Sequence, residues 1–252
     1  MADGVRLTVL GSNGTYPTPG RPASGYLVAD GDDLVWLDTG PGTLAVAISL
    51  DAVERLSAVV VSHIHPDHCS DLFMLFNLLR VGPRDRWGLP VVVPEGAADH
   101  LRRFARAGPD HDFDRVFDFR TVDSGDGVAV GDLRLRFGTA AHPVPSLVTR
   151  VEGSSSLVYS GDTGPGGDLA SMSGGASTLL CEATHQGDPP ADRYPYHLHA
   201  VEAGAVATEA GVGRLLVTHV APTLDPQVSV AEAARVFAGP VAHAHPSMEV
   251  DV

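Results

Sequence analysis

The chain has 252 residues, of which 44% are hydrophobic, with 28 Gly and 19 Pro. This length suits one large domain over residues 1–252, and the apolar share excludes a disordered chain. The 17 Lys and Arg residues against 31 Asp and Glu residues give a net charge of −14, which would repel a long polyanion. We therefore expect a small-molecule substrate and no stable nucleic-acid partner.

Cysteine content and apolar runs narrow the expected location of the protein. Two cysteines, Cys69 and Cys181, are too few for a disulfide framework, and the chain starts without a signal-type apolar stretch. No apolar run reaches the roughly 20 residues that a membrane-spanning helix needs. The sequence predicts a cytoplasmic protein without a membrane partner.

The first half of the chain is predicted to contain mainly short strands. Apolar runs separated by Gly-rich and Asp-rich turns indicate strands over residues 5–10, 26–29, 34–37, 58–61 and 89–93. The fourth of these runs is continuously apolar, which is typical of a strand buried on both faces. Residues 72–79 predict a buried helix, and a second helix is predicted over about residues 95–107 before Gly108-Pro109.

The second half of the chain is also predicted to contain short strands and helices. Strands are predicted over residues 133–137, 147–151, 156–159 and 215–217. A helix over residues 200–210 is closed by Gly211, and Val230, Ala234 and Phe237 mark one face of a final helix. The alternation of strands and helices across two halves predicts the α/β class, as an αββα four-layer sandwich.

The segment that follows the predicted strand over residues 58–61 is rich in metal-binding side chains, namely His63, His65, Asp67 and His68. Two histidines two residues apart on an extended backbone point the same way, and the last two residues turn into the following helix. Imidazole nitrogen and carboxylate oxygen are ligands that zinc accepts. The alternative, a polar loop with three histidines by chance, fits poorly with the buried strand in front.

Four further residues follow apolar strands in the same way: Asp38, His142, Asp162 and His219. Alone each is a weak signal, because a single histidine is more often a surface residue and Ser-Gly-Asp is an ordinary turn. In this order, the set resembles the metallo-β-lactamase superfamily over nearly the whole chain. The resemblance implies that Asp38 orients a ligand histidine from behind.

The resemblance also implies a pair of divalent metal ions bridged by Asp162. One metal would take His63, His65, His142 and Asp162, and the other would take Asp67, His68, Asp162 and His219. Zn²⁺ is the expected metal, with Mn²⁺ and Fe²⁺ as alternatives. Such a pair activates water, so hydrolysis is expected, with Asp67 and Asp162 fixing the attacking water and the loop Gly11–Thr15 bordering the site.

The segment His197-Leu198-His199-Ala200 resembles the His-Leu/Met-Ser/Thr-Ala segment of the ribonuclease Z-like branch. In that branch the histidine acts as a proton donor, so His197 is expected to be catalytic beside Asp67. His199 stands where that branch usually has Ser or Thr. This departure leaves open whether the usual helix-cap hydrogen bond and the substrate preference of the branch apply to this chain. Helix capping is the alternative role for both histidines.

The motifs are most similar to those of actinobacterial cyclic-nucleotide phosphodiesterases, so a small phosphodiester such as 3′,5′-cAMP is the expected substrate. Two other functions stay open. The same site would serve a lactone, thioester or amide hydrolase of a biosynthetic pathway, and a non-catalytic metal-binding protein would keep the fold without turnover. Cys181, inside an apolar run, is expected to be buried. A homodimer is an expectation from the family, with residues 73–79 as either core or interface.

Overall fold

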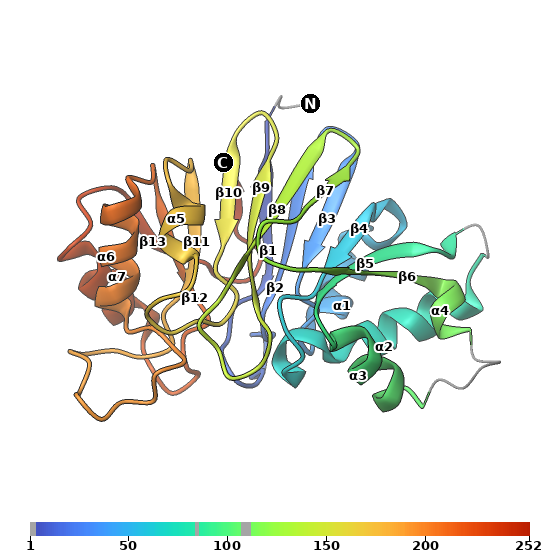
Figure 1. Ribbon diagram of the computed structural model, residues 1–252, viewed down its shortest axis with the longest axis horizontal. Helices are drawn as coiled ribbons and strands as arrows, with labels where there is room; N and C mark the ends of the chain where they lie inside the picture. The colour runs from blue at the N-terminus through green and yellow to red at the C-terminus, as the bar shows by residue number, and fades with distance from the viewer. Residues whose placement is uncertain (1–3, 84–85, 107–111) are drawn as a thin grey trace.

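The computed structural model describes residues 4–83, 86–106 and 112–252, and within them it contains two seven-stranded sheets (Figure 1). The first sheet has the order β14-β1-β2-β3-β4-β5-β6. Its strands are β1 (Arg6–Gly11), β2 (Gly25–Asp30), β3 (Asp33–Leu37), β4 (Ala58–Val60), β5 (Leu89–Pro94), β6 (Phe117–Val122) and β14 (Glu249–Asp251).

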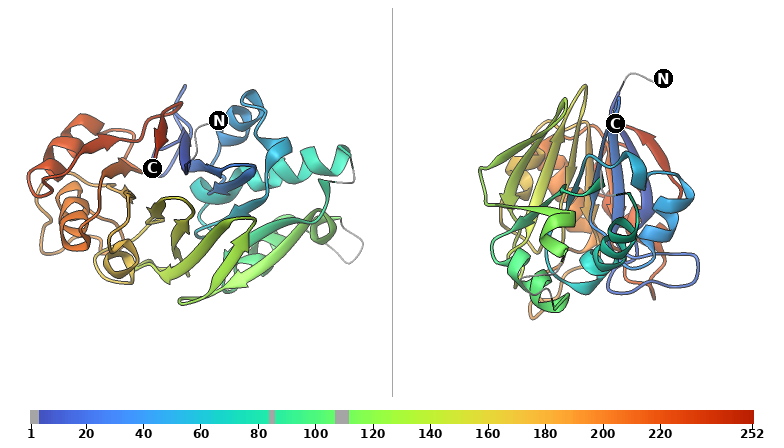
Figure 2. Two further views of the ribbon diagram at one scale, coloured as in Figure 1. Left: turned by 90° about the horizontal axis from the view of Figure 1, so that it is seen from above. Right: turned by 90° about the vertical axis from the view of Figure 1, so that its right-hand side faces the viewer.

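The second sheet has the order β13-β12-β11-β10-β9-β8-β7. Its strands are β7 (Gly127–Val130), β8 (Leu133–Thr139), β9 (Leu147–Glu152), β10 (Ser156–Tyr159), β11 (Thr178–Glu182), β12 (Leu215–Thr218) and β13 (Val241–His243). The two sheets pack face to face, which the side view shows most clearly (Figure 2).

Helices cover the outer faces of both sheets. The described helices are α1 (Thr43–Ser49), the 3-10 turn η1 (Val53–Arg55), α2 (Pro66–Val81), α3 (Ala97–Phe104), α4 (Phe113–Val116), α5 (Leu169–Ser173), α6 (Ala200–Ala210) and α7 (Pro226–Ala234). Apolar side chains of α1 to α4 cluster with the first sheet, and those of α5 to α7 cluster with the second. A third cluster lies between the sheets and contains no residue of a described helix. The predicted αββα four-layer sandwich is confirmed.

The strand β4 illustrates why a continuous apolar run is needed at the centre of this fold. Val59 packs into the cluster under the helices, whereas Ala58 and Val60 pack into the cluster between the sheets. Both faces of the strand are therefore buried. β4 pairs in parallel with β3 and β5, so the carboxyl ends of these three strands lie at one rim of the sheet.

The structure extends one helix prediction and corrects another. α2 begins at Pro66 rather than at residue 72, because proline at the first helical position loses no hydrogen bond, and Asp67 therefore lies in the first turn. Of the three residues predicted to mark one face of the final helix, Val230 and Phe237 pack into the cluster under the second sheet, whereas Ala234 is exposed and the buried positions of α7 are Ser229 and Ala233. The small Ser229 side chain accepts a hydrogen bond from Gln186 at 2.9 Å, a contact that an apolar pattern cannot reveal.

The other helix predictions need less change. α3 lies inside the helix predicted over residues 95–107, whose predicted end and Gly108-Pro109 fall outside the described residues. The apolar segment over residues 73–79 is mostly core, although Met74 and Leu78 are partly exposed. Among the described residues, no helix has both the length and the apolar character needed to cross a membrane.

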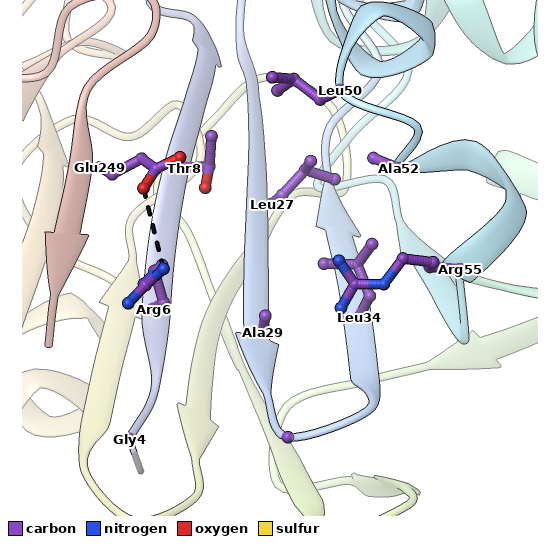
Figure 3. A pocket seen from close by; sticks show the side chains of 11 residues that line it. Gly4, Arg6, Thr8, Leu27, Ala29, Leu34, Leu50, Ala52, Arg55 and Glu249 are labelled. Atoms are coloured by element: carbon purple, nitrogen blue, oxygen red, sulfur yellow. Dashed lines mark ion pairs between the residues drawn. The ribbon is translucent and has the colours of Figure 1, made fainter. Parts of the chain in front are cut away.

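A pocket of about 350 Å³ opens on the outer face of the first sheet, beside α1 and η1 (Figure 3). Leu34 forms part of its floor, and Arg6 on β1 and Arg55 on η1 flank it. Gly31, in the turn before β3, also lines the pocket. The pocket thus lies at the opposite end of β3 from Asp38 and is separate from the predicted metal ligands.

Candidate metal centre

The candidate metal centre is built from residues at the carboxyl ends of strands. Asp38 follows β3, His63 lies just beyond β4, Asp162 just beyond β10, and His219 follows β12. β3 runs parallel to β4 in the first sheet, and β10, β11 and β12 run parallel to one another in the second, so their carboxyl ends share a rim within each sheet. The hydroxyl of Tyr159 on the second sheet donates to Asp38 on the first at 2.6 Å, which joins the two rims.

Two of these residues have an unusual backbone conformation. Asp38 has φ 55° and His219 has φ 51°, in the left-handed region that non-glycine residues rarely adopt. Such a residue costs on the order of 1 kcal/mol or more, and it persists only where the surroundings hold it. Next to His219, a Cβ on Gly14 would lie 2.7 Å from the His219 carbonyl oxygen and 3.0 Å from Nδ1. The loop Gly11–Thr15 therefore borders the site, and a side chain at position 14 would clash with His219.

The structure brings together all seven side chains that the sequence predicts as ligands. They form two groups, and within each group the potential ligand atoms lie within 4.8 Å of one another. The first group is His63, His65, His142 and Asp162, and the second is Asp67, His68, Asp162 and His219. Asp162 belongs to both groups, so its carboxylate lies where a bridging ligand would be needed.

Most of the candidate ligand rings are held from behind through Nδ1. The Nδ1 atoms of His63, His68, His142 and His219 contact Ser62 Oγ (3.1 Å), Asp38 Oδ2 (2.6 Å), the Tyr196 carbonyl oxygen (3.2 Å) and Thr184 Oγ1 (2.9 Å), respectively. Each partner can accept the Nδ1 proton, so that in the neutral form of the ring Nε2 keeps its lone pair. An outer hydrogen bond of this kind is the usual support of a metal-binding histidine.

Asp38 is the central support of the first rim. Its Oδ1 accepts the Ser62 backbone N–H at 2.6 Å, and its Oδ2 accepts from the Ser62 hydroxyl at 2.7 Å, from His68 at 2.6 Å and from Tyr159 at 2.6 Å. Asp38 is fully buried, so these contacts replace its solvation. The supporting role that the family resemblance implies for Asp38 matches this geometry.

The titration of the site also suits a bound cation. Burial lowers the pKa of His63, His65 and His142, so these rings are neutral and keep a lone pair for a metal. Burial alone would raise the pKa of Asp162, but the neighbouring histidines outweigh it and lower the pKa well below its usual range. At Asp67, burial would likewise raise the pKa, but His68 and His219 outweigh it and lower the pKa to about 2. Both carboxylates are therefore ionised.

Among the described residues, one buried atom at the centre of the cluster, His63 Nε2, has no hydrogen-bond partner, and a second, Asp162 Oδ1, is approached only by the Nε2 atoms of the candidate ligands His68 and His219, at 3.2 and 3.3 Å. An unpaired buried polar atom costs about 1–3 kcal/mol unless something else satisfies it. Asp38, Asp67 and Asp162 also concentrate negative charge in a small buried volume. A divalent cation would satisfy these atoms and balance this charge, so the residues present fit a metal centre.

Glu182 is a functional residue that sequence reasoning missed. It ends β11, is fully buried, and accepts five hydrogen bonds: from Thr163 N (2.8 Å), His197 Nδ1 (3.0 Å), Thr184 N (3.3 Å), Thr184 Oγ1 (2.7 Å) and Leu198 N (3.2 Å). Although it lies near His197 and His219, its lone pairs are already used, so it supports side chains rather than a metal. The available signal was a carboxylate that ends an apolar run, as Asp38 does.

His197 lies beside the two ligand groups and is fixed by Glu182. Its ring stacks on the ring of His219, with centroids 5.7 Å apart and planes 14° apart. Burial alone would lower the pKa of His197, but the hydrogen bond and the charge of Glu182 outweigh it and raise the pKa to about 8. Because Nδ1 is held by Glu182, Nε2 is the atom free to exchange a proton with a substrate.

His199 has a different role from His197. It is the N-cap residue of α6, and its Nδ1 donates to the carbonyl oxygens of Gln186 and Gly187 at 3.1 and 3.0 Å. Glu202 accepts the His199 backbone N–H at 3.0 Å, so the carboxylate completes the cap. His199 thus fastens the preceding loop to α6. Cys181 is fully buried, as predicted.

Comparison with known proteins supplies the family. The model of the beta-lactamase superfamily domain matches residues 34–220. The chain belongs to this superfamily. It is 39% identical to the uncharacterised protein ML1173 of Mycobacterium leprae, over 94% of this chain and 85% of that one. It is 31% identical to a ribonuclease Z of Mycolicibacterium paratuberculosis, over 94% of both chains.

Structural comparison agrees with the sequence comparison. The metallo-beta-lactamase fold protein YhfI from Bacillus subtilis superposes with a TM-score of 0.85 at 27% identity, over 98% of this chain and 100% of that one. The predicted fold and superfamily are therefore confirmed. This superfamily member is a metal-dependent hydrolase with a candidate divalent-metal site of histidines and aspartates.

Proposed function

We propose that the chain is a binuclear metal-dependent phosphodiesterase acting on a small phosphodiester such as 3′,5′-cAMP. The observation that carries the proposal is the position of His197. Glu182 holds its Nδ1 at 3.0 Å, and its ring stacks on His219 of the second ligand group. A histidine in this position can protonate a leaving oxygen while the phosphate lies against the ligand groups.

The ligand groups define what the bound metals would supply. When bound, two divalent metal ions would lower the pKa of water and neutralise a phosphoryl group, with Zn²⁺ expected and Mn²⁺ or Fe²⁺ as alternatives. Asp162 would be shared by both groups. Asp67, at 9% exposure, would accept a hydrogen bond from the attacking water.

His197 completes the reaction from the other side of the phosphate. Its Nε2 would give a proton to the leaving oxygen, and the Glu182 carboxylate would stabilise the positive ring before that transfer. Thr184 links the two halves of the site, since it accepts from His219 Nδ1 at 2.9 Å and donates to Glu182 at 2.7 Å.

Charge and chain length favour a small phosphodiester over a structured RNA. The net charge of −14 would oppose the approach of a polyanion. Residues 142–182 are all described, and they hold only β9, β10, α5, β11 and their connections, without a long insert that would grip RNA. The relative named ribonuclease Z supports phosphodiester chemistry by its name, at 31% identity.

The test is a steady-state assay of metal-replete protein against 3′,5′-cAMP and bis(p-nitrophenyl) phosphate. His197→Ala should lower phosphodiester turnover about 10²- to 10⁴-fold, the range of a lost general acid, while metal content stays unchanged. His100→Ala, which removes an exposed histidine on α3, is the matched control and should behave as wild type. Equal losses of turnover and metal in His197→Ala would contradict the assigned role.

A parallel panel of lactones, thioesters and amides separates the alternatives. Turnover of carbonyl substrates alone would replace the phosphodiesterase with a carbonyl hydrolase. Fewer than one metal per chain, not restored by added zinc or manganese, would favour a non-catalytic protein.

A further inference from the structure

An exposed tyrosine lies next to the proposed proton donor. The Tyr194 side chain is 57% exposed, and its ring centroid is 6.1 Å from that of His197, with planes 33° apart. The Tyr194 ring also meets the ring of Tyr196 edge-on, with centroids 5.1 Å apart and planes 73° apart. Tyr194 is therefore a solvent-exposed ring beside His197, whose own ring stacks on that of the candidate ligand His219.

The residue before Tyr194 is fixed to α6. The Arg193 guanidinium pairs with the carboxylate of Glu202, and both side chains are largely buried, at 19% and 22% exposure. Glu202 also accepts the backbone N–H of His199 at the start of α6. The backbone just before Tyr194 is thus held in place by the Arg193–Glu202 pair at the start of α6.

The residues after Tyr194 are fixed to the metal centre itself. The Tyr196 carbonyl oxygen accepts from Nδ1 of the candidate ligand His142 at 3.2 Å. The Pro195 carbonyl packs so closely on Gly164 that a Cβ there would lie 1.7 Å from its oxygen. Binding at a side chain between two such anchors costs little backbone entropy, because the backbone there is already ordered.

We propose that Tyr194 is a substrate-binding residue whose ring stacks on a planar ring of the phosphodiester, such as the base of a cyclic nucleotide. The proposal rests on the proposed function and names the part of the substrate that the metal ligands do not contact. With the phosphate at the ligand groups, the base would lie one sugar away from it, and Tyr194 lies next to His197, which itself stacks on the candidate ligand His219. Stacking on an aromatic side chain tolerates any base, since every base has a π-face.

The experiment is calorimetric titration of the metal-replete protein with AMP and with ribose 5-phosphate, which lacks the base. Tyr194→Leu should weaken AMP binding about 5- to 150-fold, the equivalent of about 1–3 kcal/mol for one stacked base, and leave ribose 5-phosphate binding unchanged. Tyr194→Phe keeps the ring face and should bind AMP within about threefold of wild type. Unchanged AMP binding in Tyr194→Leu would overturn the proposal. An equal loss for both ligands, or a loss in Tyr194→Phe as large as in Tyr194→Leu, would do the same.

Turnover of 3′,5′-cAMP by the wild type, measured in parallel, separates this proposal from the proposed function. If cAMP is hydrolysed but the variants bind AMP as wild type does, stacking by Tyr194 fails alone. If base-dependent binding is lost in Tyr194→Leu but the wild type hydrolyses no phosphodiester, the proposed function fails and the stacking role stands.

Discussion

Glu182→Gln tests the support of the candidate site through a single atom replacement. The glutamate Oε1 accepts from Thr163 and His197, and Oε2 accepts from Thr184 and Leu198. An amide has one accepting oxygen, so whichever way it turns, at least two buried donors face an NH₂ group. At about 1–3 kcal/mol for each unpaired donor, the variant should lose about 2–6 kcal/mol of stability. For a chain of this size that corresponds to a melting temperature lower by roughly 5–20 °C.

The assay is thermal unfolding of the metal-replete protein followed by circular dichroism, with phosphodiester turnover measured on the same samples. Turnover should fall at least tenfold at a temperature where the variant is folded, because His197 loses its fixed orientation. Glu209→Gln makes the same replacement at an exposed position on α6 and should leave both quantities unchanged. A Glu182→Gln protein that melts within 1 °C of wild type and keeps full turnover would refute this reasoning.

Three further outcomes follow from the structure. Gly14→Ala should reduce metal content measured by elemental analysis, because its Cβ would displace His219; wild-type content would show that the loop yields instead. Burial lowers the pKa of His243 to about 4, so the unfolded chain, whose histidine titrates near 6.5, takes up the proton first as pH falls. Wild type should therefore lose about 2 kcal/mol more than His243→Gln between pH 7 and pH 5 in denaturant titrations, and equal losses would contradict this. Removing metal with EDTA should lower the melting temperature and zinc should restore it, since metal at 100 times its Kd contributes about 2.7 kcal/mol; an unchanged melting temperature would argue against a metal in the fold.

Several of the candidate metal-binding residues were predictable because they interrupt a local pattern. Asp38, His63 and His219 come just after strands that are apolar and buried, and the amino-acid sequence shows both the run and its end. A strand end at the rim of a parallel sheet is where side chains from several strands converge. The order of the motifs therefore indicates which residues meet, whereas the distances between them depend on the fold.

Several strands escaped prediction because their pairing depends on distant parts of the chain. β14 is three residues long and pairs with β1, so that Asp251 lies opposite Arg6. β6 carries exposed polar residues and pairs in parallel with β5 at the edge of its sheet, where one side of the strand has no neighbour. β7 is also an edge strand, of only four residues, two of them exposed. Short edge strands have weak local signals, and their register is set by contacts far away in sequence.

The supporting contacts around the site were the least predictable part. Glu182 ends an apolar strand, but nothing local indicates that its carboxylate holds His197 and Thr184 together. The support of His142 is a backbone carbonyl, that of Tyr196, which carries no side-chain signal at all. Hydrogen bonds that hold a site residue from behind depend on which parts of the chain the fold brings together, and residue type alone does not reveal them.

The most direct test of the central claim is the kcat/KM of the metal-replete protein for 3′,5′-cAMP, measured beside a lactone and a thioester. The proposed function predicts that the phosphodiester is hydrolysed with the highest kcat/KM and that chelation abolishes this turnover. Hydrolysis of the lactone or thioester with no detectable turnover of cAMP or bis(p-nitrophenyl) phosphate would contradict it.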